Sequence, residues 1–219
     1  MITHLESLKK LIVFKLAVIY LRYLIGFAFL VASIPKIKGQ RFTSIPTTDP
    51  VGYFFEAMYQ SGFYWNFLGW SQAIAAVLLM TQRFATLGAI AFFPIILNVC
   101  LITWSINFGS GTPVITTLML LATLFLLAWD YRKWIIFFQR DHHINLNLTN
   151  TPKDTFLNDP IWTITGILFV LMSIVPAFFS PIHIPQAQSM LWWVLSLVGM
   201  GMAAPVIVLF RHRRAKALA

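Results

Sequence analysis

Six apolar runs, each long enough to cross a lipid bilayer as a helix, take up most of this 219-residue sequence. Charged residues make up only 11% of the chain, whereas soluble domains average about 25%. A backbone surrounded by lipid must satisfy its hydrogen bonds internally, so runs of this length predict helices. The sequence therefore predicts an all-α, polytopic membrane protein with six spans. These spans are roughly Val13–Ile34, Phe63–Met80, Phe84–Ile106, Pro113–Trp129, Ile161–Phe179 and Met190–Phe210.

The spacing of the spans divides the chain into three parts. We expect a four-helix transmembrane bundle in residues 1–135, a polar cytoplasmic linker in residues 136–160, and a C-terminal transmembrane helical hairpin with a basic tail in residues 161–219. Six spans put both termini on one side of the membrane, and most lysines and arginines fall on that side. Because positive charge marks cytoplasmic segments, both termini are predicted to be cytoplasmic. This flanking pattern accounts for the net charge of +9, which does not indicate nucleic acid as a partner.

The connection between the first two spans carries signals of its own. Pro35 is expected to close the first helix, because proline cannot donate a backbone hydrogen bond. Asp49-Pro50 is a helix-start signal, so Val51–Tyr59 is predicted to form a short amphipathic helix at the membrane interface. Trp65 and Trp70 predict an aromatic belt at the outer end of the second span.

Arg22 lies inside the first apolar run, where a charge is costly. It shares one helix face with Gly26, Phe29 and Ser33, and we expect that face to point into the protein. Two interpretations stay open. The side chain either reaches the cytoplasmic interface, or it contacts a ligand or a buried acid. Asp130, at the end of the fourth span, is the natural acid for a structural ion pair between the first and fourth spans.

A further set of polar residues is predicted to surround a pocket that faces the outer side of the membrane. The basic cluster after the first span could hold an anionic head group or the polar ring of a quinone, and a solvated loop is the alternative. A glutamate on the predicted interfacial helix is the counter-charge of this cluster. Two uncharged polar residues at membrane depth either hydrogen-bond between helices or line the same pocket. The candidate ligand-binding residues are Arg22, Lys36, Lys38, Arg41, Glu56, Gln72 and Asn98.

Several kinds of active site are excluded or have no support. Cys100 is the single cysteine, which rules out intramolecular disulfides and paired-cysteine relays. The adjacent histidines His142-His143 do not face one way on a helix or a strand, and no metal site is predicted. No serine–histidine–acid set and no glycine-rich phosphate loop is visible. Catalytic residues are therefore unidentified, and the sequence leaves open whether the protein is an enzyme.

Several segments resemble DoxX-like membrane proteins. Residues 22–43 read R-Y-L-I-G-F-A-F-L-V-A-S-I-P-K-I-K-G-Q-R-F-T and resemble the opening of that family. The later segments P-V-G-Y-F-F-E-A-M, F-L-G-W-S-Q and L-L-A-W-D-Y are similar to its bacterial branch, and the resemblance covers about residues 16–133. It implies a four-helix bundle in the bacterial cytoplasmic (inner) membrane. It also implies an association with redox work, because DoxD and DoxA relatives are subunits of a thiosulfate:quinone oxidoreductase.

These features lead to one main hypothesis and two alternatives. In the main hypothesis, the protein is an integral inner-membrane component of a redox-associated system that contacts a quinone. Its partners would be the lipid bilayer and a membrane or periplasmic redox protein, and any catalytic role would be that of an oxidoreductase subunit. The alternatives are a non-catalytic scaffold or assembly factor and a transporter of small molecules or lipids. The sequence does not indicate an oligomeric state.

Overall fold

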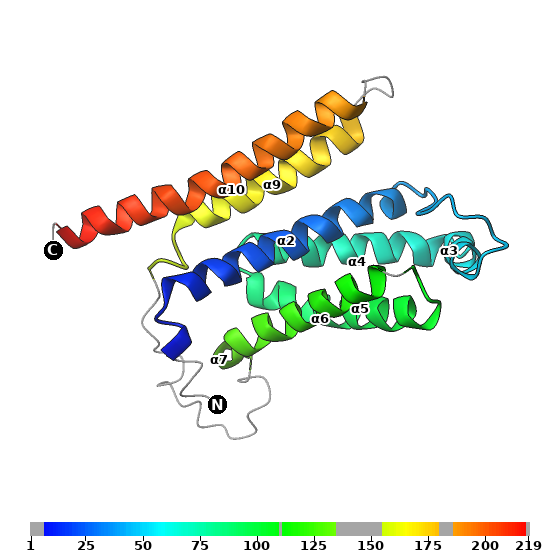
Figure 1. Ribbon diagram of the computed structural model, residues 1–219, viewed down its shortest axis with the longest axis horizontal. Coiled ribbons are helices and arrows are strands. Elements are labelled where there is room, and N and C mark those ends of the chain that lie inside the picture. Colours follow the sequence, from blue (N-terminus) through cyan, green and yellow to red (C-terminus); the bar gives the residue numbers. More distant parts are fainter. Residues whose placement is uncertain (1–6, 110, 135–154, 180–185, 218–219) are drawn as a thin grey trace.

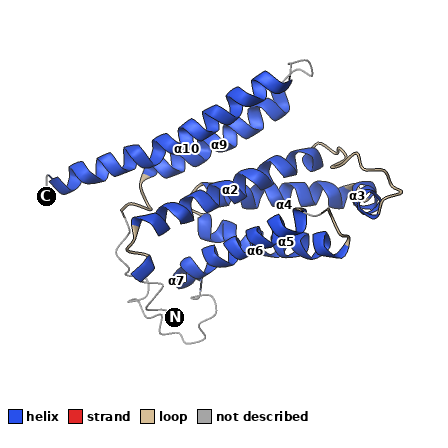
Figure 2. Ribbon diagram, in the orientation of Figure 1, coloured by secondary structure: helices blue, strands red, loops and turns tan. Residues whose placement is uncertain are grey.

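The computed structural model describes residues 7–109, 111–134, 155–179 and 186–217, and none of these residues forms a strand (Figure 1, Figure 2). The helices in these ranges differ widely in length. They are α2 (Ile12–Ile37), α3 (Pro50–Gln60), α4 (Phe63–Met80), α5 (Ala85–Ser105), α6 (Thr112–Trp129), α7 (Tyr131–Trp134), α9 (Pro160–Phe179) and α10 (Gln186–Ala217).

Five of the described helical segments are long and apolar enough to cross a membrane: α2, α4, α5, α6 and the part of α10 from Leu195 to Arg214. These helices fit a polytopic membrane protein. The remaining predicted span corresponds to α9, whose apolar segment Pro160–Val175 is shorter, so the count of six stays a prediction. Most of the predicted linker lies outside the described residues, as do His142-His143.

The helices run back and forth beside one another (Figure 1). A four-helix bundle consists of α2, α4, α5 and α6, in which α2 packs most extensively on α4, and α5 packs on both α4 and α6. The short helix α3 lies across one end of this bundle and α7 lies at the opposite end. We call these two ends the α3 end and the α7 end. The last two helices, α9 and α10, pair with each other, and α9 packs on α2 and α4.

The last turn of α2 differs from the prediction. The helix continues through Pro35 to Ile37, so the expectation that proline ends it is wrong. Gly39, two residues after the end of the helix, has a φ of 63°, which is readily adopted by a residue without a side chain. The Gly39 N–H donates to the Lys36 carbonyl at 3.1 Å, and the Gln40 N–H donates to the Pro35 carbonyl at 2.8 Å. This ending leaves Lys36 inside the helix and not in the loop that follows it.

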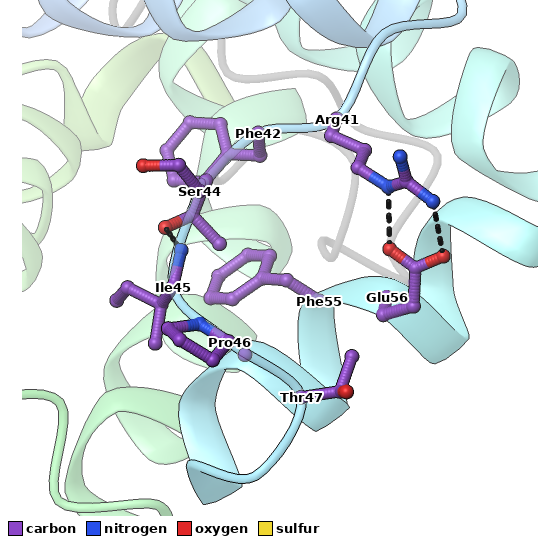
Figure 3. Close-up of a pocket in the computed structure, with 10 residues that line it drawn as sticks. Arg41, Phe42, Ser44, Ile45, Pro46, Thr47, Phe55 and Glu56 are labelled. Atoms are coloured by element: carbon purple, nitrogen blue, oxygen red, sulfur yellow. Dashed lines mark hydrogen bonds and ion pairs between the residues drawn. The ribbon is translucent and has the colours of Figure 1, made fainter.

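The interfacial helix α3 begins at the predicted signal. Asp49 Oδ1 accepts a hydrogen bond at 2.8 Å from the backbone N–H two residues further on, and a proline takes the first helical position. Gly52 packs on the backbone carbonyls of Ile45 and Pro46, so closely that a Cβ at this position would overlap them. Figure 3 shows the loop of residues 41–47 lying beside α3. The glycine therefore fixes how α3 sits on this loop.

Trp65 does not belong to the predicted aromatic belt. Its side chain is only 1% exposed, and its Nε1 donates to the Gln40 carbonyl at 2.9 Å. The loop after α2 folds over the start of α4, so the indole is covered and its one N–H group is satisfied. Trp70, five residues further on, is exposed as a belt residue should be.

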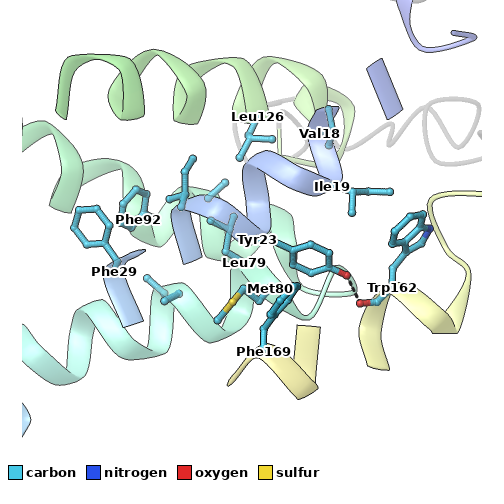
Figure 4. Close-up of a cluster of buried hydrophobic side chains, with 14 of the residues drawn as sticks. Val18, Ile19, Tyr23, Phe29, Leu79, Met80, Phe92, Leu126, Trp162 and Phe169 are labelled. Atoms are coloured by element: carbon cyan, nitrogen blue, oxygen red, sulfur yellow. Dashed lines mark hydrogen bonds between the residues drawn. The ribbon is translucent and has the colours of Figure 1, made fainter. Parts of the chain in front are cut away.

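Buried side chains from all four helices of the bundle meet in one core (Figure 4). Leu79 of α4, Phe92 of α5 and Leu126 of α6 are at most 1% exposed. Phe29 of α2 meets the Phe92 ring edge to face, with 4.5 Å between the ring centres. This core holds the four helices of the bundle in fixed positions relative to one another.

The α9–α10 hairpin joins this core through the first half of α9. The Tyr23 hydroxyl of α2 donates to the Trp162 carbonyl (Figure 4), and the Tyr23 ring meets the Phe169 ring edge to face at 5.2 Å. Gly166 lies so close to the Met80 carbonyl that a Cβ at this position would overlap it. The hairpin is therefore docked on α2 and on the end of α4 by close packing at a glycine.

Candidate functional site

Buried polar residues gather at both ends of the bundle. At the α7 end lies a group that we call the Asp130 cluster, which consists of Arg22, Gln82, Thr86, Asp130 and Lys133. At the α3 end lies a cavity between α2, α4, α5 and α6, covered by α3, which we call the Lys36 cavity. The two places differ in chemistry, because the first is a set of paired charges and the second is a largely apolar space.

Arg22 and Asp130 form a buried ion pair in the Asp130 cluster. Arg22 Nη2 lies 2.6 Å from Asp130 Oδ2, and the two side chains are 5% and 8% exposed. Arg22 Nη1 donates to Gln82 Oε1 at 2.9 Å. Thr86 Oγ1 donates to Asp130 Oδ2 at 3.0 Å, and Lys133 Nζ lies 3.0 Å from Oδ1. The cluster thus connects α2, the turn between α4 and α5, the start of α5, and the junction of α6 with α7.

The surroundings of Asp130 keep its carboxyl ionised. Burial by itself raises the pKa of Asp130, but the charges of Arg22 and Lys133, with hydrogen bonds from Lys133 and Thr86, outweigh burial and hold the pKa below its usual value. Gln82 has a φ of 58°, uncommon for a residue with a side chain, and it presents its amide oxygen to Arg22. This geometry is that of the structural ion pair considered for the first and fourth spans.

The Lys36 cavity has a volume of about 640 Å³, which is within the range of small-molecule sites in proteins. Its walls are mainly apolar and rich in aromatic rings, which come from Phe29, Phe42, Phe54, Phe55, Tyr64, Phe67 and Phe108. Several polar side chains interrupt these walls, namely Lys36, Ser71, Gln72, Asn98, Thr103, Thr112 and Thr116. An apolar space with a small number of polar groups is the usual composition of a ligand site.

Lys36 is the one charged residue among those that line this cavity, and it is only 5% exposed. Its Nζ donates to the Ala32 carbonyl at 2.7 Å, and it lies 4.3 Å from the centre of the Phe42 ring and 5.4 Å from that of Trp65. No carboxylate in the described part of the chain pairs with it. An ammonium has three N–H donors, so this single hydrogen bond leaves donors for a ligand.

Glycine at position 69 of α4 sets the place of the lysine. A Cβ at Gly69 would lie 2.8 Å from Lys36 Cβ and 2.9 Å from the Ile37 nitrogen, which is closer than such atoms can approach. The absence of a side chain therefore allows α4 to pack directly against the last turn of α2. Rings cover the ammonium while the helices hold its stem, an arrangement in which cation–π contacts contribute to its stability.

Gln72 and Asn98 also line the Lys36 cavity, and both belong to the set of residues that was predicted to line one pocket. Gln72 is 3% exposed, and its Oε1 is buried without a hydrogen-bond partner in the described chain. Nearly all buried polar atoms in proteins have such a partner, so the unpaired Oε1 on the cavity wall could accept a hydrogen bond from a ligand. Asn98 lies at the exposed edge of the cavity and donates through Nδ2 to the Pro94 carbonyl at 2.8 Å.

Three other predicted residues lie outside the Lys36 cavity. Lys38 is exposed just after the end of α2. Arg41 and Glu56 form a bidentate ion pair, in which Nε lies 2.7 Å from Oε2 and Nη2 lies 2.9 Å from Oε1. This pair connects the loop after α2 to α3. With Phe55, they line a second pocket of about 620 Å³ (Figure 3). The hydrogen bond from Arg41 lowers the pKa of Glu56, and Glu56 raises the pKa of Arg41, so both groups stay charged.

The structure does not bring Arg22 into the pocket that was predicted for it. Arg22 precedes Lys36 by fourteen residues on the same helix, which corresponds to about 21 Å along the axis at 1.5 Å per residue. The predicted single pocket is therefore divided, with Lys36, Gln72 and Asn98 at one end of the bundle and Arg22 at the other.

Sequence reasoning missed three members of the Asp130 cluster. Lys133 follows Asp130 by three residues, a spacing at which charges on a helix interact, and this spacing could have identified it. Gln82 and Thr86 carry no such signal, because only the folded arrangement of the helices brings them to Arg22 and Asp130.

Comparison with known proteins adds one partial similarity. No protein-family model matches the chain, and no solved structure matches it. The "Uncharacterized protein YwoB" of Bacillus subtilis (strain 168) is 39% identical to this chain over 75 residues. The match covers 34% of this chain and 47% of the relative, so the chain spans about half the length of that protein. The name of the relative states no activity, and the function must be argued from the site.

Proposed function

We propose that this protein is an integral component of a membrane redox system and that it binds a quinone in the Lys36 cavity. One observation carries the proposal: a buried ammonium and a buried amide oxygen without a hydrogen-bond partner lie on the walls of one largely apolar cavity. The resemblance of residues 16–133 to DoxX-like proteins supports the same function, because relatives in that family are subunits of a thiosulfate:quinone oxidoreductase.

A quinone combines a flat ring, two carbonyl oxygens and an apolar tail, and the cavity has a complement for each part. The Lys36 ammonium can donate a hydrogen bond to a carbonyl oxygen, and Gln72 Oε1 can accept one from a hydroxyl of the reduced form, the quinol. The aromatic side chains that line the cavity supply packing surface for the ring. The other walls are mainly apolar and suit the tail. A hydrogen bond to a charged group contributes about 1.5–3 kcal/mol, so we expect Lys36 to contribute most to affinity.

We place the α7 end in the cytoplasm and the α3 end on the outer side of a bacterial inner membrane. Positive charge marks the cytoplasmic side, and α7-end cations outnumber those near the α3 end, which are Lys36, Lys38 and Arg41. In this orientation the polar end of the cavity lies in the outer half of the membrane, within reach of a membrane or periplasmic redox partner. The α7-end cations among the described residues include Lys9, Lys10, Lys15, Arg83, Arg132, Lys133, Arg211, Arg213 and Arg214.

Mass spectrometry of the small molecules that remain bound to the mildly purified protein tests this proposal. We expect a quinone to be enriched relative to an unrelated membrane protein from the same membranes. Lys36→Met keeps most of the side-chain length but removes the charge, and it should weaken quinone binding roughly 10- to 100-fold, as the loss of one charged hydrogen bond implies. Gln72→Leu should weaken it in the same direction. Lys38→Met is the matched control, because Lys38 is exposed and lies outside the cavity.

Two results would overturn the proposal. One is the absence of any quinone enrichment over the unrelated protein. The other is an equal quinone content in Lys36→Met, Gln72→Leu and Lys38→Met, because binding would then occur elsewhere. If a specific partner protein co-purifies at native expression while no quinone does, the scaffold or assembly-factor hypothesis becomes the better one.

A further inference from the structure

The residues that line the Lys36 cavity differ in exposure from one wall to another. Gln72 and the cavity residues of α6 are buried or half-buried, so they form the inner wall. Tyr64 and Phe67 on α4 are more than half exposed, and Ala91 and Asn98 on α5 are also exposed. All four line the cavity. The open side therefore lies between α4 and α5, on a surface of the bundle that faces the hydrocarbon of the membrane.

α4 and α5 pack closely near the α7 end. Gly88 lies against the backbone of Leu79 there, with no room for a Cβ. The lining residues of α5 begin at Ala91 and continue to Thr103, toward the α3 end. Pro94 lies within this segment. Because α4 and α5 are antiparallel and Gly88 lies at Leu79, Asn98 lies roughly level with Gly69. Gly69 is the residue of α4 that packs on Lys36.

The end of the cavity that faces the membrane surface is covered. Phe54, Phe55 and Met58 of α3 form part of the lining, together with Phe42 from the loop. The close packing of Gly52 on this loop fixes the cover in place. The pair of Arg41 with Glu56 adds a second connection between the loop and α3 (Figure 3). A molecule that arrives from water would have to displace α3, whereas one that arrives from the membrane meets the open side.

We infer that the ligand is a long-chain amphiphile that enters sideways from the bilayer between α4 and α5, with its head at Lys36 and Gln72 and its tail leaving past Ala91. This inference rests on the proposed function for the choice of a quinone as the head group. The distance from Lys36 to Phe29 along α2 is about 10 Å, so the cavity holds a head and the first part of a tail. Gln72 Oε1 can accept a hydrogen bond, so a hydroxyl oxygen can face it.

Binding measurements in lipid nanodiscs test the sideways entry with two probes. One probe is a quinone with a long isoprenoid tail, and the other is the same ring without the tail. Ala91→Phe and, independently, Ser71→Phe place a ring at the open side, from α5 and from α4. Ile90→Phe is the matched control, because Ile90 is exposed and adjacent in sequence but does not line the cavity.

We expect Ala91→Phe and Ser71→Phe to raise the Kd of the long-tailed quinone at least tenfold relative to Ile90→Phe, and to change the Kd of the tailless ring less than twofold. Equal affinity of all three variants for the long-tailed probe would overturn the sideways path. A loss of both probes in the two variants would also count against it, because the head site itself would then be damaged. Lys36→Met separates the two proposals, since it should weaken both probes whether or not the path is correct.

Discussion

Replacing Asp130 with asparagine removes a charge from the Asp130 cluster while keeping the size of the side chain. Arg22 would then be a buried cation without its carboxylate, since the remaining bond to Gln82 supplies no negative charge. Breaking a buried ion pair by removing one partner typically costs about 3–5 kcal/mol. We expect Asp130→Asn to lower the free energy of unfolding by that amount.

The other contacts of Asp130 contribute less to the free energy of unfolding than its pair with Arg22. The Lys133 side chain is 64% exposed, and such pairs contribute about 0–1 kcal/mol. The hydrogen bond from Thr86 is worth about 1 kcal/mol. We therefore expect Lys133→Met and Thr86→Val each to cost about 1 kcal/mol or less. Most of the loss in Asp130→Asn comes from the unpaired Arg22, so adding Arg22→Met to Asp130→Asn should recover at least half of it.

Unfolding of the purified protein in detergent micelles, followed by tryptophan fluorescence, measures these differences. The same experiment as a function of pH gives an independent check. The folded-state pKa of Asp130 lies below its usual value of 3.8, so its contribution is fully present above about pH 3.8 and is lost as the pH falls through the folded-state pKa. The wild type should lose this part of its free energy of unfolding on acidification. Asp130→Asn lacks the carboxyl and should not show this loss.

The reasoning would be refuted if Asp130→Asn cost no more than Lys133→Met, because the pair with Arg22 would then contribute nothing beyond an exposed one. It would also be refuted if the double variant were less stable than Asp130→Asn by the full cost of Arg22→Met alone. Strict additivity of that kind means that the two side chains do not interact.

Two further predictions concern glycines that allow close packing. Gly166→Leu should detach α9 from the end of α4, because the side chain would overlap the Met80 carbonyl. Proteolysis in the segment before α9 should then be faster than in the exposed control Ile164→Leu. Unchanged proteolysis would contradict this prediction. Gly52→Val should lift α3 from its loop and increase hydrogen exchange in α3 alone, whereas uniform exchange across the bundle would point to general destabilisation.

The sequence was sufficient for features that depend on local patterns. The second span was predicted at Phe63–Met80, the bounds that α4 has in the structure. Asp49 caps α3 as its position before a proline suggests. By contrast, the pairing of Arg22 with Asp130 joins distant segments, and it was one of two interpretations that the sequence left open.

Features that depend on packing between distant segments could not be predicted in the same way. Pro35 does not end α2, because the bonds of Gly39 and Gln40 close the helix after it. Trp65 is buried because the loop after α2 folds over it, and its sequence position gives no sign of that loop. The division of the polar residues into two groups also depends on helix length, since a set of polar residues can share one helix face and still lie at opposite ends of the bundle.

The attachment of the α9–α10 hairpin has a mechanical consequence. Its described contacts with α2 and α4 involve the first half of α9, and Tyr20 adds one hydrogen bond to the Gly201 carbonyl of α10 at 2.8 Å. Toward the α3 end, the hairpin and the bundle diverge (Figure 1). The part of α9 from Gly166 to Phe179 is about 20 Å long, so a tilt of about 10° around this attachment would move the far end of the helix by about 3 Å. The attached part of α9 is packed beside Tyr23 and Met80. A neighbouring molecule that pushed on the unattached end of the hairpin would therefore strain that packing.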